Sequence, residues 1–66
     1  MTKTIQELRE SRHWTQLELA NQLGVRPESI SNWERGRAQP RYRYLRQIAE
    51  LFEMSPDDIK LVAPEA

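Results

Sequence analysis

The sequence contains no cysteine and a single histidine, His13. Disulfides and thiolate metal sites are therefore excluded, and one imidazole cannot form a metal-binding cluster by itself. The chain also lacks the run of about 20 apolar residues that a bilayer-spanning helix needs, and its N-terminus lacks the apolar stretch of a signal peptide. We therefore expect a cytoplasmic protein that binds no metal, no cofactor and no membrane.

The chain is also short. Its 66 residues leave room for one domain. A domain of this size buries only about 60% of the surface that its unfolded chain exposes, so we expect a stability of a few kcal/mol. We expect a single domain over residues 1–66, with its core at about residues 4–62 and a C-terminal tail at 63–66.

The formal net charge is zero, but the charges are unevenly distributed. Residues 26–46 carry six arginines and two glutamates, whereas residues 47–66 carry one lysine and five acidic residues. A basic middle provides a field that attracts phosphate, because binding depends on nearby charges rather than on their total. The alternative, from charge alone, is a merely solvated surface.

Capping residues mark several helix boundaries. Thr4 with Glu7, and Thr15 with Glu18, have the spacing of capping boxes. Gly24 is suited to end a helix, because glycine adopts the left-handed conformation without a Cβ penalty. Together with the helical spacing of the apolar residues, these signals predict no sheet and an all-α fold of five helices, over residues 4–12, 15–23, 27–36 and 41–53 and from Ser55-Pro56-Asp57-Asp58 onward.

Residues 16–35 have the pattern of two helices that cross over a short turn. Ala20 is small enough for close helix contact, and Gly24 permits the positive φ that the turn needs. Ile30 and Trp33 stand where apolar anchors would fix the second helix to the core. Each feature alone is common, but their joint spacing predicts a helix-turn-helix unit.

This unit contains the stretches Thr15-Gln16-Leu17-Glu18-Leu19-Ala20, Leu23-Gly24-Val25 and Ser29-Ile30-Ser31-Asn32-Trp33-Glu34-Arg35-Gly36, followed by Pro40. Together with Leu45, Ile48-Ala49 and Ser55-Pro56-Asp57-Asp58-Ile59, they resemble the phage-repressor/Cro-like (Xre) helix-turn-helix family over about residues 5–61. The resemblance implies a compact, lambda-repressor-like domain of five helices. It also implies a transcriptional regulator that places residues 27–35 in the major groove of double-stranded DNA, as a homodimer on a two-fold operator.

The resemblance implies DNA contacts at particular positions. Gln16 is similar to the family residue that binds a phosphate at the start of the second helix; the alternative is a plain surface glutamine. Asn32 would form a bidentate pair with adenine, and Glu28 would accept a hydrogen bond from cytosine N4. Contacts to bases or to the backbone are implied for Gln16, Arg26, Glu28, Ser29, Ser31 and Asn32.

Four more arginines lie in or beside the loop that follows the second helix of the unit: Arg35, Arg37, Arg41 and Arg43. In the family, this loop follows the phosphate backbone. Either Arg41 or Arg43 would enter the minor groove, and the sequence does not choose between them. Each of the four is also compatible with simple solvation.

Two charged residues have a structural role by the same resemblance. The family pairs an arginine at the position of Arg9 with a glutamate at the position of Glu34. Such a pair would orient the second helix of the unit rather than contact DNA.

Some positions depart from the family pattern. Arg26 occupies a helix-cap position that usually carries serine, threonine or asparagine, and Pro27 replaces a polar residue that faces the groove. Glu28 brings a negative charge close to phosphates. Glu53 replaces a glycine, so either it adopts a strained left-handed conformation or the fourth helix ends differently.

Aromatic and apolar residues near the C-terminal end have more than one interpretation. Tyr42 and Tyr44 would pack at the rim of the core or at a dimer contact, and a tyrosine hydroxyl can also bond a phosphate. The candidate dimer contact is formed by Ile59, Leu61 and Val62.

The function predicted from these observations is sequence-specific regulation of transcription. The same fold is compatible with a restriction-system controller, with an antitoxin, or with a protein-interaction module that binds DNA weakly or not at all. An enzyme is not expected, because the sequence has no cluster of nucleophile, base and acid and no glycine-rich phosphate loop. Single-stranded RNA binding would need an aromatic stacking platform that the sequence does not provide.

Overall fold

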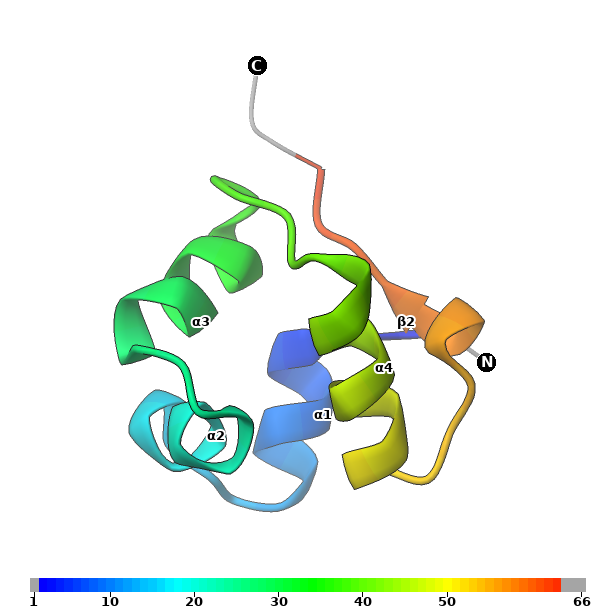
Figure 1. Ribbon diagram of the computed structural model, residues 1–66, viewed down its shortest axis with the longest axis horizontal. Helices are drawn as coiled ribbons and strands as arrows, with labels where there is room; N and C mark the ends of the chain where they lie inside the picture. The colour runs from blue at the N-terminus through cyan, green and yellow to red at the C-terminus, as the bar shows by residue number, and fades with distance from the viewer. Residues whose placement is uncertain (1, 64–66) are drawn as a thin grey trace.

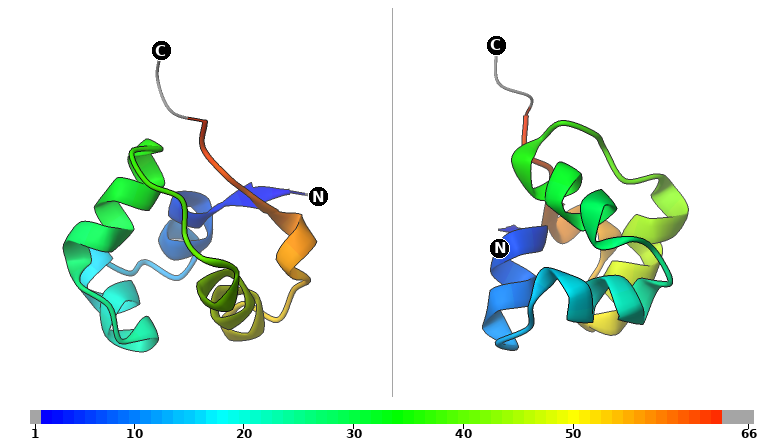
Figure 2. Two further views of the ribbon diagram at one scale, coloured as in Figure 1. Left: turned by 45° about the horizontal axis from the view of Figure 1, so that its top comes forward. Right: turned by 90° about the vertical axis from the view of Figure 1, so that its left-hand side faces the viewer.

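The computed structural model describes residues 2–63 and contains four α-helices in that range (Figure 1). The predicted tail at 63–66 lies, apart from Ala63, outside the described residues. The helices pack around one core, with α2 and α3 on one side, α4 on the other and α1 behind them (Figure 2). The elements in chain order are β1 Lys3–Thr4, α1 Ile5–Ser11, α2 Gln16–Leu23, α3 Pro27–Arg35, α4 Tyr42–Leu51, the 3-10 turn η1 Pro56–Asp58, and β2 Ile59–Lys60.

The first two helices begin at the predicted capping boxes. The Thr4 hydroxyl accepts from Glu7 N–H at 3.1 Å while the Glu7 carboxylate accepts from Thr4 N–H at 2.9 Å. Thr15 and Glu18 repeat this arrangement at 3.1 and 3.0 Å. Gly24 ends α2 in the left-handed conformation, at φ 70°. These boundaries follow from local hydrogen bonding, so the sequence was sufficient to predict them.

The core is built from one apolar face of each helix. Leu19, Ile30 and Ile48, from α2, α3 and α4, are fully buried at its centre. Buried residues from every helix and from β2 complete it: Ile5, Leu8, Ala20, Leu23, Trp33, Ala49 and Ile59. None of the helices in residues 2–63 is both long and apolar enough to cross a membrane.

The predictions of a fifth helix and of no sheet were wrong. Ser55 does cap a turn, accepting from Asp57 N–H at 3.3 Å, but the turn is a 3-10 turn of three residues. The chain then extends, and β2 pairs in parallel with β1, Ile59 beside Lys3. A segment this short does not repay the cost of helix nucleation, whereas the extended form gains backbone partners from the start of the chain. Helical periodicity within the segment could not reveal partners that lie more than fifty residues away.

The links at the end of α1 and of α4 are joined to each other. His13 and Glu53 both adopt positive φ, 59° and 56°, so of the two alternatives for Glu53 the left-handed one is observed. Between them, Arg12 donates to the Leu51 carbonyl at 2.8 Å, and its guanidinium lies 4.4 Å from the ring centre of Phe52. These contacts hold the two strained links in place.

Candidate nucleic-acid interface

Helix α3 is anchored along one side and exposed along the other. Ile30 and Trp33 are buried against the core, and Val25 N–H, in the turn before α3, donates to the Ala20 carbonyl at 3.1 Å. Positions three, four and seven apart lie on one side of a helix, so the side opposite the core carries a row that we call the outer row. The outer row consists of Glu28, Ser31, Asn32 and Arg35, of which Glu28 and Arg35 are exposed and the other two are half-buried.

The orientation of α3 is set by a cluster of charged and polar groups. Glu34 accepts from Arg9 Nε at 2.7 Å and from Arg9 Nη2 at 3.2 Å, so the pair implied by the resemblance is present. Arg9 Nη1 also donates to the Trp14 carbonyl at 2.7 Å. The hydrogen bond with Glu34 raises the pKa of Arg9 and outweighs the opposing effect of burial. This cluster connects α1, α3 and the link that leads into α2.

Gln16 belongs to the same cluster, which the sequence did not predict. Its Nε2 donates to Glu34 Oε1 at 3.0 Å, and the side chain is half-buried at the start of α2. One amide hydrogen is used in this bond, so the second amide hydrogen remains available to donate to a phosphate oxygen. The geometry is therefore compatible with the phosphate contact that the resemblance implied.

The α3–α4 loop is held against the end of α3 and against the C-terminal segment. Arg37 N–H donates to the Asn32 carbonyl at 2.9 Å. Gln39 Nε2 donates to the Val62 carbonyl at 3.0 Å, and Gly36, at φ 77°, lies directly beside the backbone of residues 62–63. Figure 2 shows the C-terminal segment passing next to this loop. Sequence reasoning missed the contact, because it joins positions far apart in the chain and carries no motif.

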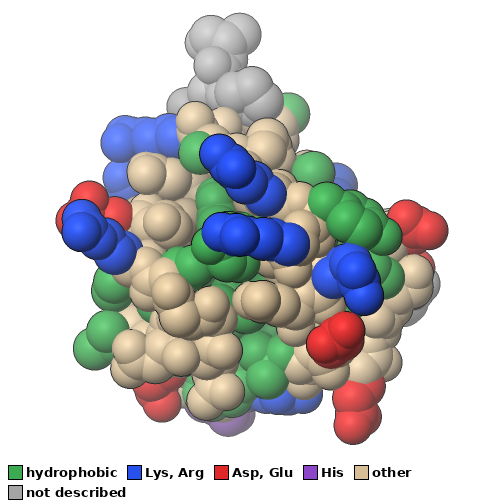
Figure 3. Space-filling model, viewed as in Figure 1, with side chains coloured by type: hydrophobic (Ala, Val, Ile, Leu, Met, Phe, Trp, Pro, Cys, Tyr) green, Lys and Arg blue, Asp and Glu red, His purple; other side chains and the backbone are tan. Residues whose placement is uncertain are grey.

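The predicted basic residues are exposed around α3 and the loop. Figure 3 shows Lys and Arg side chains gathered over the upper half of one face, whereas acidic side chains lie toward its sides and lower edge. Arg26 lies at the start of α3 without a side-chain capping bond, as expected from the departure at that position. The arginines exposed from α3 through the start of α4 are Arg26, Arg35, Arg37, Arg41 and Arg43. Of the remaining predicted contact residues, Ser29 and Ser31 are half-buried.

The two tyrosines of α4 differ in their surroundings. Tyr44 packs against the core, with its ring 5.5 Å from the ring of Trp33 between centroids, whereas Tyr42 is 66% exposed. The expectation of packing at the core rim therefore holds for Tyr44. At the other end of the chain, Ile59 is buried in the core, so its proposed place at a dimer contact was wrong.

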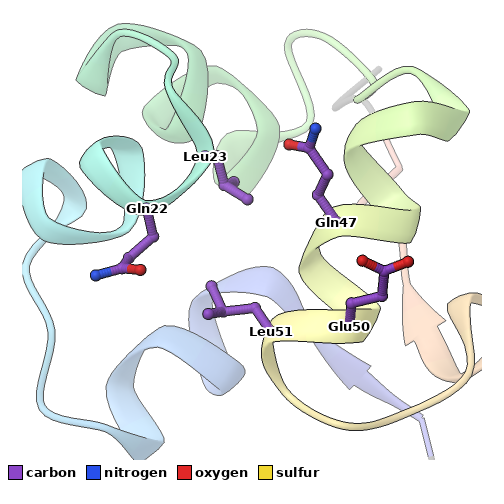
Figure 4. Close-up of a pocket in the computed structure, with 5 residues that line it drawn as sticks. All are labelled: Gln22, Leu23, Gln47, Glu50 and Leu51. Carbon is purple, nitrogen blue, oxygen red and sulfur yellow. The ribbon is translucent and has the colours of Figure 1, made fainter.

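A shallow groove between α2 and α4 has no arrangement suited to catalysis. It is lined by Gln22, Leu23, Gln47, Glu50 and Leu51, and the two leucines point into the space between the helices (Figure 4). The polar groups that line this groove are the amides of Gln22 and Gln47 and the carboxylate of Glu50. They supply neither a nucleophile nor a paired acid and base. Within residues 2–63, no group of His, Asp and Glu side chains is arranged to hold a metal ion.

Comparison with known proteins agrees with this geometry. A family model described as "Helix-turn-helix" matches residues 5–59. The chain is also similar to the HTH-type transcriptional activator BcrR of Enterococcus faecalis, with 36% identity over 55 residues. This match covers 83% of the chain but only 27% of that relative. No solved structure gives a significant match.

The family match covers most of the chain, including α2, the turn at Gly24 and α3. The chain therefore belongs to the Cro/C1-type (Xre) helix-turn-helix family of DNA-binding transcriptional regulators, which is not a family of enzymes.

Proposed function

We propose that the protein is a sequence-specific transcriptional regulator that inserts α3 into the major groove of duplex DNA, as a homodimer on a two-fold operator. The observation that carries the proposal is the outer row of α3, which lies opposite the buried face. Exposed arginines lie before the start of α3 (Arg26), at its last residue (Arg35) and just after it (Arg37). The Arg9–Glu34 ion pair fixes the direction in which this row points. In this proposal, residues 4–62 form one DNA-binding domain that acts in the cytoplasm.

The residues of the outer row and those around it divide into residues that read bases and residues that bind phosphate. Asn32 offers an amide for bidentate pairing with adenine, and Glu28 offers an acceptor for cytosine N4. Ser29 and Ser31 have hydroxyls suited to a base edge or a phosphate. The arginines contribute binding that is largely independent of sequence and falls steeply with salt, through release of counterions. Phosphate contacts are assigned to Gln16, Arg26, Arg35, Arg37, Arg41 and Arg43.

A fluorescence-anisotropy titration against random duplex DNA at two salt concentrations tests the proposal. We expect wild-type binding to weaken steeply with salt, and Arg35→Ala to weaken binding to all duplexes. Asn32→Ala should instead lose preference for a duplex selected by the wild type, by roughly tenfold. Lys60→Ala serves as the charge-matched control, since Lys60 is exposed on β2, away from α3.

A second candidate is an antitoxin or another protein-interaction module that keeps the fold and binds DNA weakly. Two observations favour it: Glu28 places a negative charge on the outer row, and the α2–α4 groove has exposed walls with two leucines pointing into it. A folded protein that binds no duplex at low salt would support this candidate. The search would then turn to protein partners.

A further inference from the structure

Arg43 and Tyr44 make a contact that is unusual for neighbours in a helix. Arg43 Nη2 donates to the Tyr44 hydroxyl at 2.9 Å, and the guanidinium carbon lies 4.7 Å from the centre of the same ring. Adjacent residues in an α-helix do not face each other, so both side chains must turn toward one another to meet. The hydrogen bond and the ring contact favour one position of the guanidinium at the exposed surface of α4.

Tyr44, which holds Arg43, itself packs against α3. Tyr44 is half-buried, and its ring lies 5.5 Å from that of Trp33, with 41° between the planes. Trp33 is a buried residue of α3, next to Asn32 in the outer row. A chain of contacts thus runs from α3 through Trp33 and Tyr44 to the guanidinium of Arg43.

Among residues 2–63, Arg41 has no comparable support. It is the N-cap residue of α4, and its carbonyl accepts from Tyr44 N–H at 2.9 Å, but its side chain makes no capping bond. The exposed side chain would lose its rotamer freedom on binding DNA, whereas that of Arg43 already has the contacts with Tyr44 that restrain it. Arg43 uses one N–H for the tyrosine, and the guanidinium keeps four further donors for phosphate oxygens.

We propose that Tyr44 is a positioning residue whose hydroxyl holds Arg43 for a contact with a DNA phosphate, in fixed relation to the recognition helix. The inference rests on the proposed function, because it requires duplex binding through α3 and the following loop. It assigns the ordered phosphate contact at the start of α4 to Arg43 rather than to Arg41.

A double-mutant cycle with a salt titration tests the inference. Tyr44→Phe keeps the ring that packs on Trp33 and removes only the acceptor for Arg43. We expect Arg43→Gln to reduce the slope of log affinity against log salt by about 0.9, which corresponds to one phosphate contact. Tyr44→Phe should weaken binding about fivefold at unchanged thermal stability, and the double variant should bind no more weakly than Arg43→Gln alone. Tyr42→Phe is the matched control from the same turn of α4, and Arg41→Gln is measured beside Arg43→Gln to compare the two arginines.

Several outcomes would overturn the inference. Additive losses in the double variant would mean that the hydroxyl does not act through Arg43. Unchanged or tighter binding by Tyr44→Phe would mean that the tyrosine holds Arg43 away from DNA. A reduced salt slope for Arg41→Gln, with no change for Arg43→Gln, would assign the contact to Arg41. A folded wild type that binds no duplex would overturn the proposed function as well, and the wild-type titration alone reveals that case.

Discussion

At the scale of single residues, Glu34 connects α3 to α1 and to the start of α2. Its side chain is 5% exposed and that of Arg9 is 13% exposed, so the ion pair between them lies largely away from water. The two oxygens of Glu34 accept three hydrogen bonds, two from Arg9 and one from Gln16. Removal of the carboxylate would leave the guanidinium poorly solvated, which costs more than removal of an exposed pair.

We therefore predict that Glu34→Ala destabilises the fold by about 3 kcal/mol, a large part of the stability of a domain this small. Thermal unfolding followed by circular dichroism measures the effect. Glu50→Ala, which removes an exposed glutamate from α4, is the control and should stay within about 0.5 kcal/mol of the wild type. An unchanged melting temperature for Glu34→Ala would show that the pair does not support α3.

The capping box of α1 gives a prediction about pH. The backbone N–H of Thr4, and then its side chain, lower the pKa of Glu7 from the usual 4.5. The folded state therefore binds this proton less readily than the unfolded state does. The contribution of the Glu7 carboxylate to stability is present above pH 4.5. It is lost as the pH falls through the lower pKa that Glu7 has in the folded state.

Glu7→Gln should lower the melting temperature near neutral pH, and the difference from the wild type should shrink as the pH falls below 4.5. Thermal melts of both proteins from about pH 7 to about pH 3 measure this difference. A difference that stays constant over the range would show that the carboxylate charge does not contribute through the cap.

Residue-level signals predicted local contacts well and distant ones poorly. The capping boxes could be predicted because each joins positions three apart, and the Arg9–Glu34 pair was implied only by family resemblance. The bond from Gln16 to Glu34 spans eighteen residues and depends on the packing angle between α2 and α3. No spacing in the sequence encodes that angle.

At the scale of elements, the two glycines that end α2 and α3 have different surroundings. Both adopt left-handed φ, 70° for Gly24 and 77° for Gly36. A Cβ added at Gly24 would meet no atom within 4 Å, whereas one added at Gly36 would lie 2.7 Å from the carbonyl oxygen of Ala63. Gly36 therefore permits both the end of α3 and the close approach of the C-terminal segment.

We predict that Gly24→Ala costs about 1 kcal/mol, the strain of a left-handed alanine, and that Gly36→Ala costs at least about 1 kcal/mol more. The additional loss arises because the backbone at residues 62–63 must move away from the α3–α4 loop. Urea denaturation of the two variants compares the losses directly. Equal losses would indicate that the segment shifts without cost and does not support the loop.

The helices were predictable as elements, whereas the C-terminal strand was not. Four helices carry a full apolar face and a defined start, and their predicted ranges differ from the observed ones by two residues or fewer at each end. Residues 55–60 have a capping serine and acidic residues that also suit a helix start. The deciding factor was the pairing of β2 with β1, which burial of Ile59 accompanies. Such pairing is a tertiary effect that local propensity does not report.

At the scale of the whole molecule, charge is separated although its sum is zero. The arginine-rich segment 26–46 includes α3 and the loop that follows it, while the acidic residues between 47 and 63 lie on α4, η1 and the link between them. This separation lets a neutral chain present a basic face to DNA. The sequence predicted the separation, but not that the C-terminal segment would return to contact the α3–α4 loop.

The C-terminal segment is also the place to test dimer formation. Ile59 is buried in the core, but Leu61 is 42% exposed on the extended chain that follows β2. An exposed leucine at this position contributes little to the fold, and its burial against a second copy would contribute about 2 kcal/mol to association. We therefore predict that Leu61→Gln leaves the melting temperature unchanged and weakens self-association.

The measurement compares duplexes that carry one half-site or two, selected with the wild-type protein. Leu61→Gln should bind a single half-site with wild-type affinity and lose about thirtyfold in affinity for the paired site, because only the paired site benefits from contact between the copies. Leu17→Gln, at an exposed leucine of α2, is the matched control and should keep the wild-type affinity for the paired site. If the paired site keeps its advantage in Leu61→Gln, the copies meet through another surface. If the wild type itself shows no advantage for paired sites, the protein binds DNA as a monomer.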